Sequence, residues 1–530
     1  MLDRMSVLNA ITGLVLLTAA AAHAANLPAA PQIFDASYSA PNGHTLTVNA
    51  GGDLQAALNQ AQLGDTIVLE AGATFTGPFS LPNKTSGSGW IYVQTSAYRQ
   101  LPAVGTRIAP ADAANMPKLV APANDHAITT VNGSHHFRFV GVEFKTGHDL
   151  YVVNLVQLDN SDKSAATVTH HVTFDRCYFL ADTTAGARRG LLGNAAYLAV
   201  TDSYFEGFRE VGADSQAIVA YNTPGPIKLI NNYLSGAGEN VLFGGADSAD
   251  PSLVPSDIEI RGNHFFKPLS WIGSQWVVKN LLEFKSVHRV LVTGNLFENN
   301  WSAAQSGFSL LITPRNQNGN APWSVTEDIA ITNNRFVNLG SGINILGADS
   351  EHPSKSTARI LIKNNQLTAN GLNNAAGWAF LLLAAPLDVT IDHNTIFSST
   401  AFLVAENAPG QGKTDRFTFT NNIVVSSAGL IGRGTGPGLN TLNTFFSNWT
   451  IAKNAITSGS ENAYPSGNFF PFQMSDIRFV NAVSGNFSLA GTSPYKKAGT
   501  DGLDLGADLS AAPNTSASAI PQPPKGFQVH

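Results

Sequence analysis

The sequence predicts an all-β solenoid, in which short parallel strands follow one another in coils along a single axis. A segment of alternating apolar residues, one or two small polar residues and a hydrophobic pair recurs at intervals of roughly 31 residues. From residue 232 onward, the corner position of every repeat is Asn. The chain also contains 48 Gly, and Gly and Asn both tolerate the left-handed backbone of tight turns.

The repeats define strands and the corners between them. Alternation with a period of two predicts strands, and the spacing leaves no room for crossover helices. Asn side chains cap turns, and when stacked at the strand spacing they can bond to one another as a ladder. A β-sandwich would not place one Asn in each repeat. The corner positions predict about ten coils and are Cys177, Ser203, Asn232, Asn263, Asn295, Asn334, Asn365, Asn394, Asn422 and Asn454.

Composition excludes several classes of protein. Charged residues make up 13% and apolar residues 43% of the 530 residues, which argues against a disordered chain. A formal net charge of −6 argues against a general nucleic-acid binder. No apolar run after the N-terminal segment is long enough for a transmembrane anchor. We expect a monomer without nucleic-acid partners.

The ends of the chain carry different signals. Arg4, an apolar stretch and the small-x-small triplet Ala22-His23-Ala24 predict a secretory signal and a secreted or periplasmic location. The predicted parts are a signal peptide (1–24), a leader segment (25–43), an N-terminal cap with the first coils (44–130), the solenoid (131–508) and a disordered tail (509–530).

Two local features support this division. A short amphipathic helix is predicted from the N-cap Asp53 to a stop at Gly64, with Leu54, Ala57, Leu58 and Ala61 on one face, and it would cover the first coil. The only cysteine, Cys177, cannot form an internal disulfide, and we expect it to be a small buried hydrophobe.

The cap segment 53–69, the Asn corners and the ending Gly491–Asp508 resemble the pectate-lyase-like right-handed parallel β-helix superfamily. The resemblance covers roughly residues 44–508 and implies a right-handed parallel β-helix with an N-terminal capping helix. It leaves function open, because that fold carries lyases, hydrolases, epimerases and adhesins.

Two patterns in the middle of the chain predict a glycan site. Four of the seven tryptophans lie between residues 271 and 323, and tryptophan faces stack on sugar rings, although these residues could equally fill the bases of loops. Residues 261–289 have a local charge of +4, which could focus an anionic polysaccharide or simply form a solvated face. The candidate binding residues are Trp271, Trp276, Trp301, Trp323, Arg261, Lys267, Lys279 and Arg289.

One strand in this region suggests the chemistry. Alternation places Leu282 and Phe284 inward and puts Glu283 and Lys285 on the outer side, with Arg315 expected one coil away. Such a set suits β-elimination on a uronate, in which a cation neutralises the carboxylate and a base removes the C5 proton. Lys285 could instead be a surface lysine paired with Glu283. His264 and His288 are expected neighbours.

This strand is similar to the alginate-lyase and chondroitin-lyase branch of the superfamily. The resemblance implies Lys285 as the base and Arg315 as the carboxylate neutraliser or acid partner. From their expected positions, Glu283 and His264 are added as candidate catalytic residues beside them. Arg315 follows Pro314 here, which departs from the Leu-x-Leu-Arg-His-Gly strand of that branch. The acidic Ca²⁺ cluster usual in pectate lyases is not evident. No cofactor is certain, although Ca²⁺ is a candidate.

Other acidic and imidazole groups give alternatives. Asp247, Glu239 and Asp257 could act as the paired carboxylates of a glycoside hydrolase or as Ca²⁺ ligands, while an Asp after Gly-Ala also caps turns. The pairs His135-His136 and His170-His171 receive no role, because adjacent strand residues face opposite ways. A third hypothesis is a non-catalytic β-helix that binds glycans or surfaces.

Overall fold

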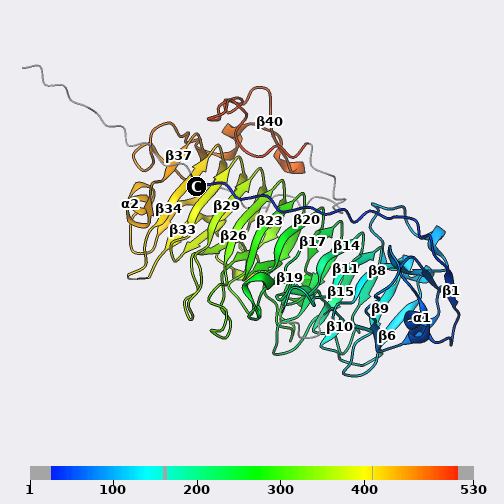
Figure 1. Ribbon diagram of the computed structural model, residues 1–530. Coiled ribbons are helices and arrows are strands. Elements are labelled where there is room, and N and C mark those ends of the chain that lie inside the picture. Colours follow the sequence, from blue (N-terminus) through cyan, green and yellow to red (C-terminus); the bar gives the residue numbers. More distant parts are fainter. Residues whose placement is uncertain (1–24, 159–163, 409, 511–530) are drawn as a thin grey trace, which may run out of the picture.

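Successive turns of the chain stack their strands into three parallel faces of one long coil (Figure 1). The computed structural model describes residues 25–158, 164–408 and 410–510. The predicted signal peptide and almost all of the predicted tail lie outside these residues. No helix within the described ranges is long and apolar enough to cross a membrane.

Face 1 is a 15-stranded sheet that contains the first strand of each coil. Its strands are β1 (Thr45–Val48), β2 (Thr66–Leu69), β5 (Ile91–Thr95), β8 (His135–Val140), β11 (His170–Asp175), β14 (Ala196–Thr201), β17 (Ile227–Ile230), β20 (Ser256–Arg261), β23 (Val287–Thr293), β26 (Thr326–Thr332), β29 (Ala358–Lys363), β32 (Leu387–Asp392), β34 (Thr414–Thr420), β36 (Phe446–Ser447) and β37 (Thr450–Ala452).

Face 2 contains the strand that follows each corner. Its strands are β3 (Thr74–Thr76), β6 (Lys118–Ala121), β9 (Glu143–Thr146), β12 (Tyr178–Leu180), β15 (Tyr204–Phe208), β18 (Tyr233–Gly236), β21 (His264–Phe266), β24 (Leu296–Asn300), β27 (Arg335–Leu339), β30 (Gln366–Ala369), β33 (Thr395–Glu406), β35 (Ile423–Gly432) and β38 (Ala455–Ile456).

Face 3 completes each coil and joins face 2 through the long strands β33 and β35, which pair on both faces. Its other strands are β4 (Phe79–Leu81), β7 (Ile128–Thr130), β10 (Asn154–Gln157), β13 (Arg189–Leu192), β16 (Gln216–Ala220), β19 (Glu239–Phe243), β22 (Leu282–Phe284), β25 (Phe308–Ile312), β28 (Ser341–Leu346) and β31 (Phe380–Leu383).

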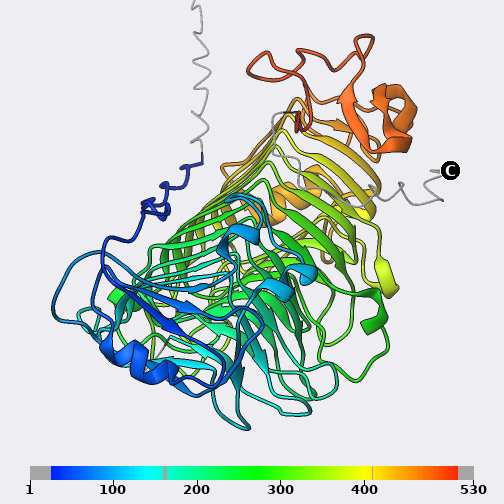
Figure 2. The same cartoon turned by 90° about the vertical axis from the view of Figure 1, so that its right-hand side faces the viewer.

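The remaining elements lie at the ends and in the loops. They are the α-helices α1 (Leu54–Gln60) and α2 (Leu439–Phe445), the antiparallel strands β39 (Phe479–Asn481) and β40 (Asn486–Leu489), and the 3₁₀ turns η1 (Tyr98–Gln100), η2 (Pro110–Asn115), η3 (Pro251–Leu253), η4 (Leu269–Trp271), η5 (Leu372–Asn374), η6 (Met474–Ile477) and η7 (Ala482–Ser484). Helices α1 and α2 lie at opposite ends of the coil, and the C-terminal segment with β39 and β40 lies beside the last coils (Figure 1 and Figure 2).

Inward side chains stack in rows along the coil and form its core. On face 2 the rings of Phe265, Phe297 and Phe336 stack with centroids 4.5 Å apart at each step. Stacking follows from the parallel pairing in register, which places like positions of successive coils over one another. Cys177 is fully buried in this core, and burial raises the pKa of its thiol to about 12. The predicted all-β parallel β-helix is thus confirmed.

The Asn corners lie between face 1 and face 2 and are buried. Asn334 is representative: its Nδ2 donates to Oδ1 of Asn365 at 2.9 Å, and its own Oδ1 accepts from Nδ2 of Asn295 at 2.9 Å. Asn334 Nδ2 also donates to the carbonyl of Val292 at 3.0 Å. Each side chain therefore satisfies backbone and side-chain partners in the neighbouring coils.

The ends differ in detail from the sequence prediction. Helix α1 begins after Asp53, whose side chain accepts from the N–H of Ala56, but it ends at Gln60 rather than near Gly64, because Ala61 has an extended backbone. Parallel pairing between coils ends at β38, after which the chain folds back along earlier coils, so that the N–H of Asp508 donates to Oδ1 of Asn364.

The segment before β1 runs along face 1 as an extended strap (Figure 1). The N–H groups of Asn26, Ala29 and Gln32 donate to the carboxylates of Asp388, Asp328 and Asp257, respectively, at 2.8–2.9 Å. These three aspartates all have φ between 53° and 58°, so their side chains leave the strand alternation and face the strap.

Candidate functional site

The centre of face 3 is the strand β22, and it has the predicted alternation. Leu282 and Phe284 are fully buried in the core, while Glu283 lies on the outer side with Lys285 beside it. The Nζ atom of Lys285 lies 3.6 Å from Oε1 of Glu283, and the Lys285 side chain is 18% exposed. Thr313 Oγ1 donates to the same Glu283 oxygen at 3.3 Å. Lys285 is therefore a partly exposed cation beside a buried carboxylate.

Arg315 lies one coil beyond Lys285, as predicted. Its backbone N–H donates to the carbonyl oxygen of Lys285 at 2.9 Å. Its guanidinium binds Oδ1 of Asp349 at 2.9 Å and Oε2 of Glu351 at 2.5 Å. The structure therefore brings the two backbones together, while the two cationic heads contact different carboxylates.

A second carboxylate, Glu239, lies on the preceding coil and is fully buried. Gln216 Nε2 donates to its Oε2 at 2.7 Å, and the ammonium of Lys279 lies 3.9 Å from its Oε1 and 2.6 Å from Oδ2 of Asp214. Burial, followed by the negative charges of Glu283 and Asp214, raises the pKa of Glu239 well above its ordinary value.

Two buried oxygens in this group have no hydrogen-bond partner among the described residues: Oε1 of Glu239 and Oδ1 of Asn280. Asn280 Nδ2 donates to Oε2 of Glu283 at 3.0 Å. We use the name carboxylate cluster for Glu239, Glu283, Asn280 and Lys279. Unpaired buried oxygens beside a second carboxylate form a donor set that suits a hard cation such as Ca²⁺.

Sequence reasoning missed several residues of this site. Arg189 Nε donates to Oε1 of Gln216 at 3.1 Å, and Gln216 bonds Glu239, so one polar row crosses three coils. Asn280 and Thr313 were missed as well. Arg189 is aligned with Gln216, and Gln216 with Glu239, on neighbouring strands. This alignment depends on the lengths of the loops between the strands, which the sequence pattern does not give.

The four predicted tryptophans separate into two pairs. Trp271 and Trp301 are buried in one apolar cluster at the base of the loop that holds η4, so they are core residues rather than a sugar platform. Trp276 and Trp323 are half-buried. Arg209 lies 4.8 Å from the Trp276 ring centroid, and Nε1 of Trp323 donates to Oγ of Ser248 at 2.9 Å.

The predicted basic patch does not form one surface. Lys267 is fully buried, and its ammonium donates to the carbonyls of Gly236, Ala237 and Gly238, so it cannot serve as a substrate-binding cation. Burial lowers its pKa. Arg261 lies on face 1 and pairs with Glu259 at 2.9 Å.

Arg289 is also on face 1, where it makes a bidentate pair with Asp257 at 2.7 and 2.8 Å. Asp257 further accepts from the strap at Gln32, so this carboxylate is structural and cannot pair with Glu239 on face 3. Asp247 accepts the N–H groups of Asn318 and Asn320 and thus holds a loop. Asp247, Glu239 and Asp257 therefore do not lie together in one site.

The predicted histidine neighbours of Lys285 lie elsewhere. His264 is on face 2, where its Nε2 contacts Oε2 of Glu298 at 2.8 Å. His288 is on face 1 and contacts Oε1 of Glu327 at 2.8 Å. The proposal below therefore rests on Lys285, Glu283 and Arg315 without His264.

The two neighbouring histidine pairs do not alternate as predicted. His136 and His171 have φ of 57° and 53°, and this left-handed backbone turns both side chains outward beside His135 and His170. Burial and the adjacent imidazoles lower the pKa of His136 and His170 to about 4.

A cavity of about 940 Å³ lies under the C-terminal segment, away from face 3. It is bordered by Lys363, His393 and Asn364 of the coil and by Lys496 and Asp508 of the returning chain. The carboxylate cluster does not line it, so we do not assign it to the same site.

Comparison with solved structures supports the fold. The alginate lyase AlyGC of family PL6 matches at 12% identity and a TM-score of 0.50, covering 90% of this chain and 59% of that one. This chain has the fold of the pectate-lyase-like parallel β-helix superfamily. At this identity the likeness extends to the fold alone.

Other matches are more distant. A mannuronic acid-specific family 6 lyase from human gut microbiota matches at 11% identity and a TM-score of 0.49, covering 81% of this chain and 91% of that one. The Dettilon tailspike protein gp208 matches at 15% identity and a TM-score of 0.42, covering 77% of this chain and 62% of that one. The family model described as disaggregatase related matches residues 326–499, which is less than half of the chain. No curated protein matches.

Proposed function

We propose that this parallel β-helix is a polysaccharide lyase that cleaves a uronate-containing glycan by β-elimination at the centre of face 3. The observation that carries the proposal is the position of Lys285, which is partly exposed beside Glu283, with Arg315 bonded to its backbone. The fold is one that other lyases use, and the names of AlyGC and the mannuronic acid-specific enzyme describe such lyases.

The reaction needs a base and a cation at the same sugar. The C5 proton lies next to the carboxylate carbon, and its removal becomes easier when that carboxylate is neutralised. In our proposal Nζ of Lys285 takes this proton. The electron pair forms the C4–C5 double bond, and the glycosidic oxygen at C4 leaves with a proton.

Arg315 supplies the positive charge for the substrate carboxylate, or the proton for the leaving oxygen. Its guanidinium now contacts Asp349 and the 60% exposed carboxylate of Glu351. A substrate carboxylate would replace the exposed partner, because an arginine guanidinium binds carboxylates through its N–H groups.

Ca²⁺ would be held by Glu239, Asn280 and Glu283, which offer oxygen ligands, two of them unpaired. Lys279 now places its ammonium within 3.9 Å of Glu239 and partly balances the charge of the carboxylate cluster.

The proposal also covers the surroundings of the reaction. Trp276 and Trp323 are half-buried, and we propose that they contact sugar rings. An anionic polysaccharide, a monomeric enzyme and a secreted or periplasmic location remain predictions, and the location follows from the predicted signal in residues 1–24.

A glycoside hydrolase is the second candidate, because Glu239 has a raised pKa next to the charge of Glu283. A carboxylic acid that stays protonated beside a carboxylate is the pattern of an acid and its partner in glycosidases. In this structure the pair is Glu239 and Glu283 rather than the predicted Asp247 or Asp257.

The purified chain should be incubated with alginate, pectate and glycosaminoglycans, with and without added Ca²⁺. Ultraviolet absorbance of the new double bond supports the lyase. New reducing ends without that absorbance support the hydrolase. Saturable retention of a glycan with neither product supports a binding protein and contradicts both enzyme proposals.

A further inference from the structure

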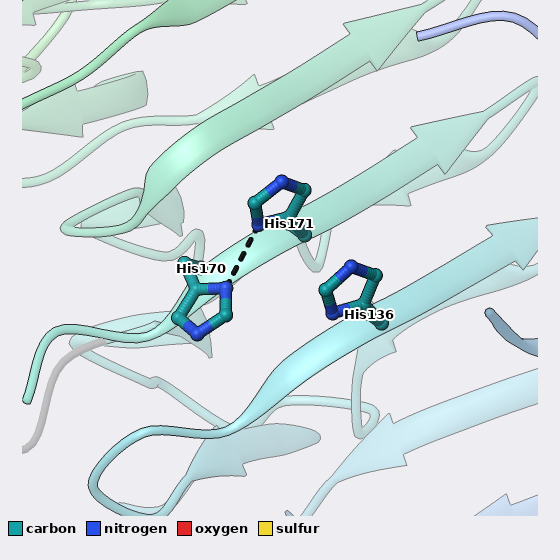
Figure 3. Close-up of side chains that lie close together, drawn as sticks. All are labelled: His136, His170 and His171. Carbon is teal, nitrogen blue, oxygen red and sulfur yellow. Dashed lines mark hydrogen bonds between the residues drawn. The ribbon is translucent and has the colours of Figure 1, made fainter. Parts of the chain in front are cut away.

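Four imidazoles meet on the outer side of face 1, far along the coil from Lys285. His135 and His136 belong to β8, and His170 and His171 occupy the same positions of β11 on the next coil. Figure 3 shows His136, His170 and His171 facing one another across the two strands. We call these four residues the histidine cluster.

The arrangement depends on an unusual backbone. In a regular strand His135 and His136 would point to opposite sides of the sheet. The positive φ of His136 and His171 breaks this alternation on both strands at the same register, and all four rings stand outside the core. Non-glycine residues rarely take this conformation, yet many strands of face 1 repeat it near their start, for example at Tyr197 and Asp257. It is therefore a regular feature of this face, and on β8 and β11 it brings two pairs of histidines together.

The rings are stacked and their nitrogens converge. His135 stacks on His170 with centroids 4.9 Å apart, and His136 stacks on His171 at 4.4 Å. Within each strand, the Nδ1 atoms of the two histidines lie 2.7 Å apart in β8 and 2.8 Å apart in β11. One ring nitrogen from each of His136, His170 and His171 lies within 4.8 Å of the other two.

We propose that the histidine cluster binds a divalent first-row transition metal ion, with His136, His170 and His171 as ligands and His135 completing the set. Tetrahedral ligands at Zn–N distances of about 2.0–2.1 Å lie roughly 3.4 Å from one another. Small ring rotations bring the present separations to that value, which makes Zn²⁺ the probe of choice.

The chemistry of the donors selects this class of ion. All of them are imidazole nitrogens, which suit Zn²⁺, Cu²⁺ and Ni²⁺, whereas Ca²⁺ and Mg²⁺ prefer oxygen. The Nε2 atom of His135 lies 2.8 Å from the carbonyl oxygen of Lys84. A metal-ligating histidine commonly donates its second ring N–H to such a carbonyl. The lone pair of His135 Nδ1, which now faces Nδ1 of His136 at 2.7 Å, would then be the one that binds the ion.

Neighbouring aromatic rings hold the cluster in place. Trp90 packs its edge against His136 at 5.3 Å, and Tyr197 stacks on His171 at 4.3 Å. Tyr197 in turn contacts Phe34 of the strap at 5.6 Å. An ion bound here would join β8 to β11, and it would fix the region that the strap crosses.

The test uses the full chain without an affinity tag, dialysed against Zn²⁺ and separately against Ca²⁺, with bound metal measured by elemental analysis. We expect about one Zn²⁺ per chain and a raised Tm, and an excess of Ca²⁺ should not displace the bound Zn²⁺. Co²⁺ in place of Zn²⁺ should give the visible spectrum of an imidazole-bound ion.

Two variants locate the ion. His170→Ala and, as a milder change, His171→Gln should each lose most of the bound Zn²⁺ and the increase in Tm. His148→Ala is the matched control, because His148, Asp149 and Asp182 form the other potential ligand group among the described residues, and it is exposed. Absence of Zn²⁺ from the wild-type chain, or loss of Zn²⁺ in His148→Ala alone, would overturn the proposal.

Discussion

Arg315 donates its backbone N–H to the carbonyl of Lys285 at 2.9 Å, yet its guanidinium contacts Asp349 and Glu351 of the following loop. Parallel stacking thus fixes the separation of the two backbones, while the loop carboxylates fix the direction of the arginine head. In the proposed β-elimination Lys285 is the base and Arg315 is the cation, and a substrate carboxylate would have to displace Glu351 from the Arg315 guanidinium.

Glu351→Gln should lower KM for an anionic glycan several-fold with little change in Tm. The Glu351 carboxylate is 60% exposed, so its pair with Arg315 contributes little to stability, but it competes with the substrate for the guanidinium. Steady-state kinetics and a thermal melt measure both effects. Glu461→Gln, an exposed glutamate elsewhere, is the control. An unchanged or raised KM contradicts the role given to Arg315.

Asn334→Ala should destabilise the coil by about 2–4 kcal/mol. The change removes the donor to Asn365 and Val292, and it removes the oxygen that accepts from the backbone N–H and from Nδ2 of Asn295 in a buried corner. Denaturant unfolding measures the loss. Asn462→Ala, at an exposed position, should stay within about 0.5 kcal/mol of the parent. Equal effects of the two changes would show that the Asn column adds nothing.

Glu327→Gln should make the stability of the fold less dependent on pH under acidic conditions. Hydrogen bonding from His288, followed by the contacts with Arg359, lowers the pKa of Glu327 to about 2 despite partial burial. A lowered pKa stabilises the fold above the ordinary pKa of glutamate, about 4.3, and this contribution disappears as pH falls toward 2.

The free energy of unfolding, measured from pH 6 down to pH 2, tests this expectation. The parent should lose about 1 kcal/mol more of it across that range than Glu327→Gln. The difference is small because the carboxylate is partly exposed and solvent screens the pair. Parallel curves for the two proteins would contradict the assigned cause.

The sequence was sufficient for the repeating part of this molecule. Inward positions such as Leu282 and Phe284 alternate strictly, and the Asn corners recur at the same point of each coil, so both signals are local and periodic. Glu283, Lys285 and Arg315 could be placed on neighbouring coils for the same reason.

Other parts depend on contacts that no local pattern contains. Lys267 lies in a loop whose composition suggests exposure, but three carbonyls of Gly236, Ala237 and Gly238 bind its ammonium in the interior. The outward turn of His136 and His171 needs a positive φ that histidine rarely adopts, so the alternation rule failed there. The polar row of Arg189, Gln216 and Glu239 on face 3 could not be predicted, because loops of unequal length separate its strands.

The most direct test of the lyase proposal is the rate of double-bond formation by Lys285→Ala on the glycan that the parent cleaves. Lys413→Ala, on a distant coil and exposed, is the matched control. Loss of a positioned base should reduce kcat by about 10²-fold or more while Tm and glycan binding stay near those of the parent. The account predicts that loss for Lys285→Ala and full activity for Lys413→Ala; full activity of a folded Lys285→Ala enzyme would contradict it.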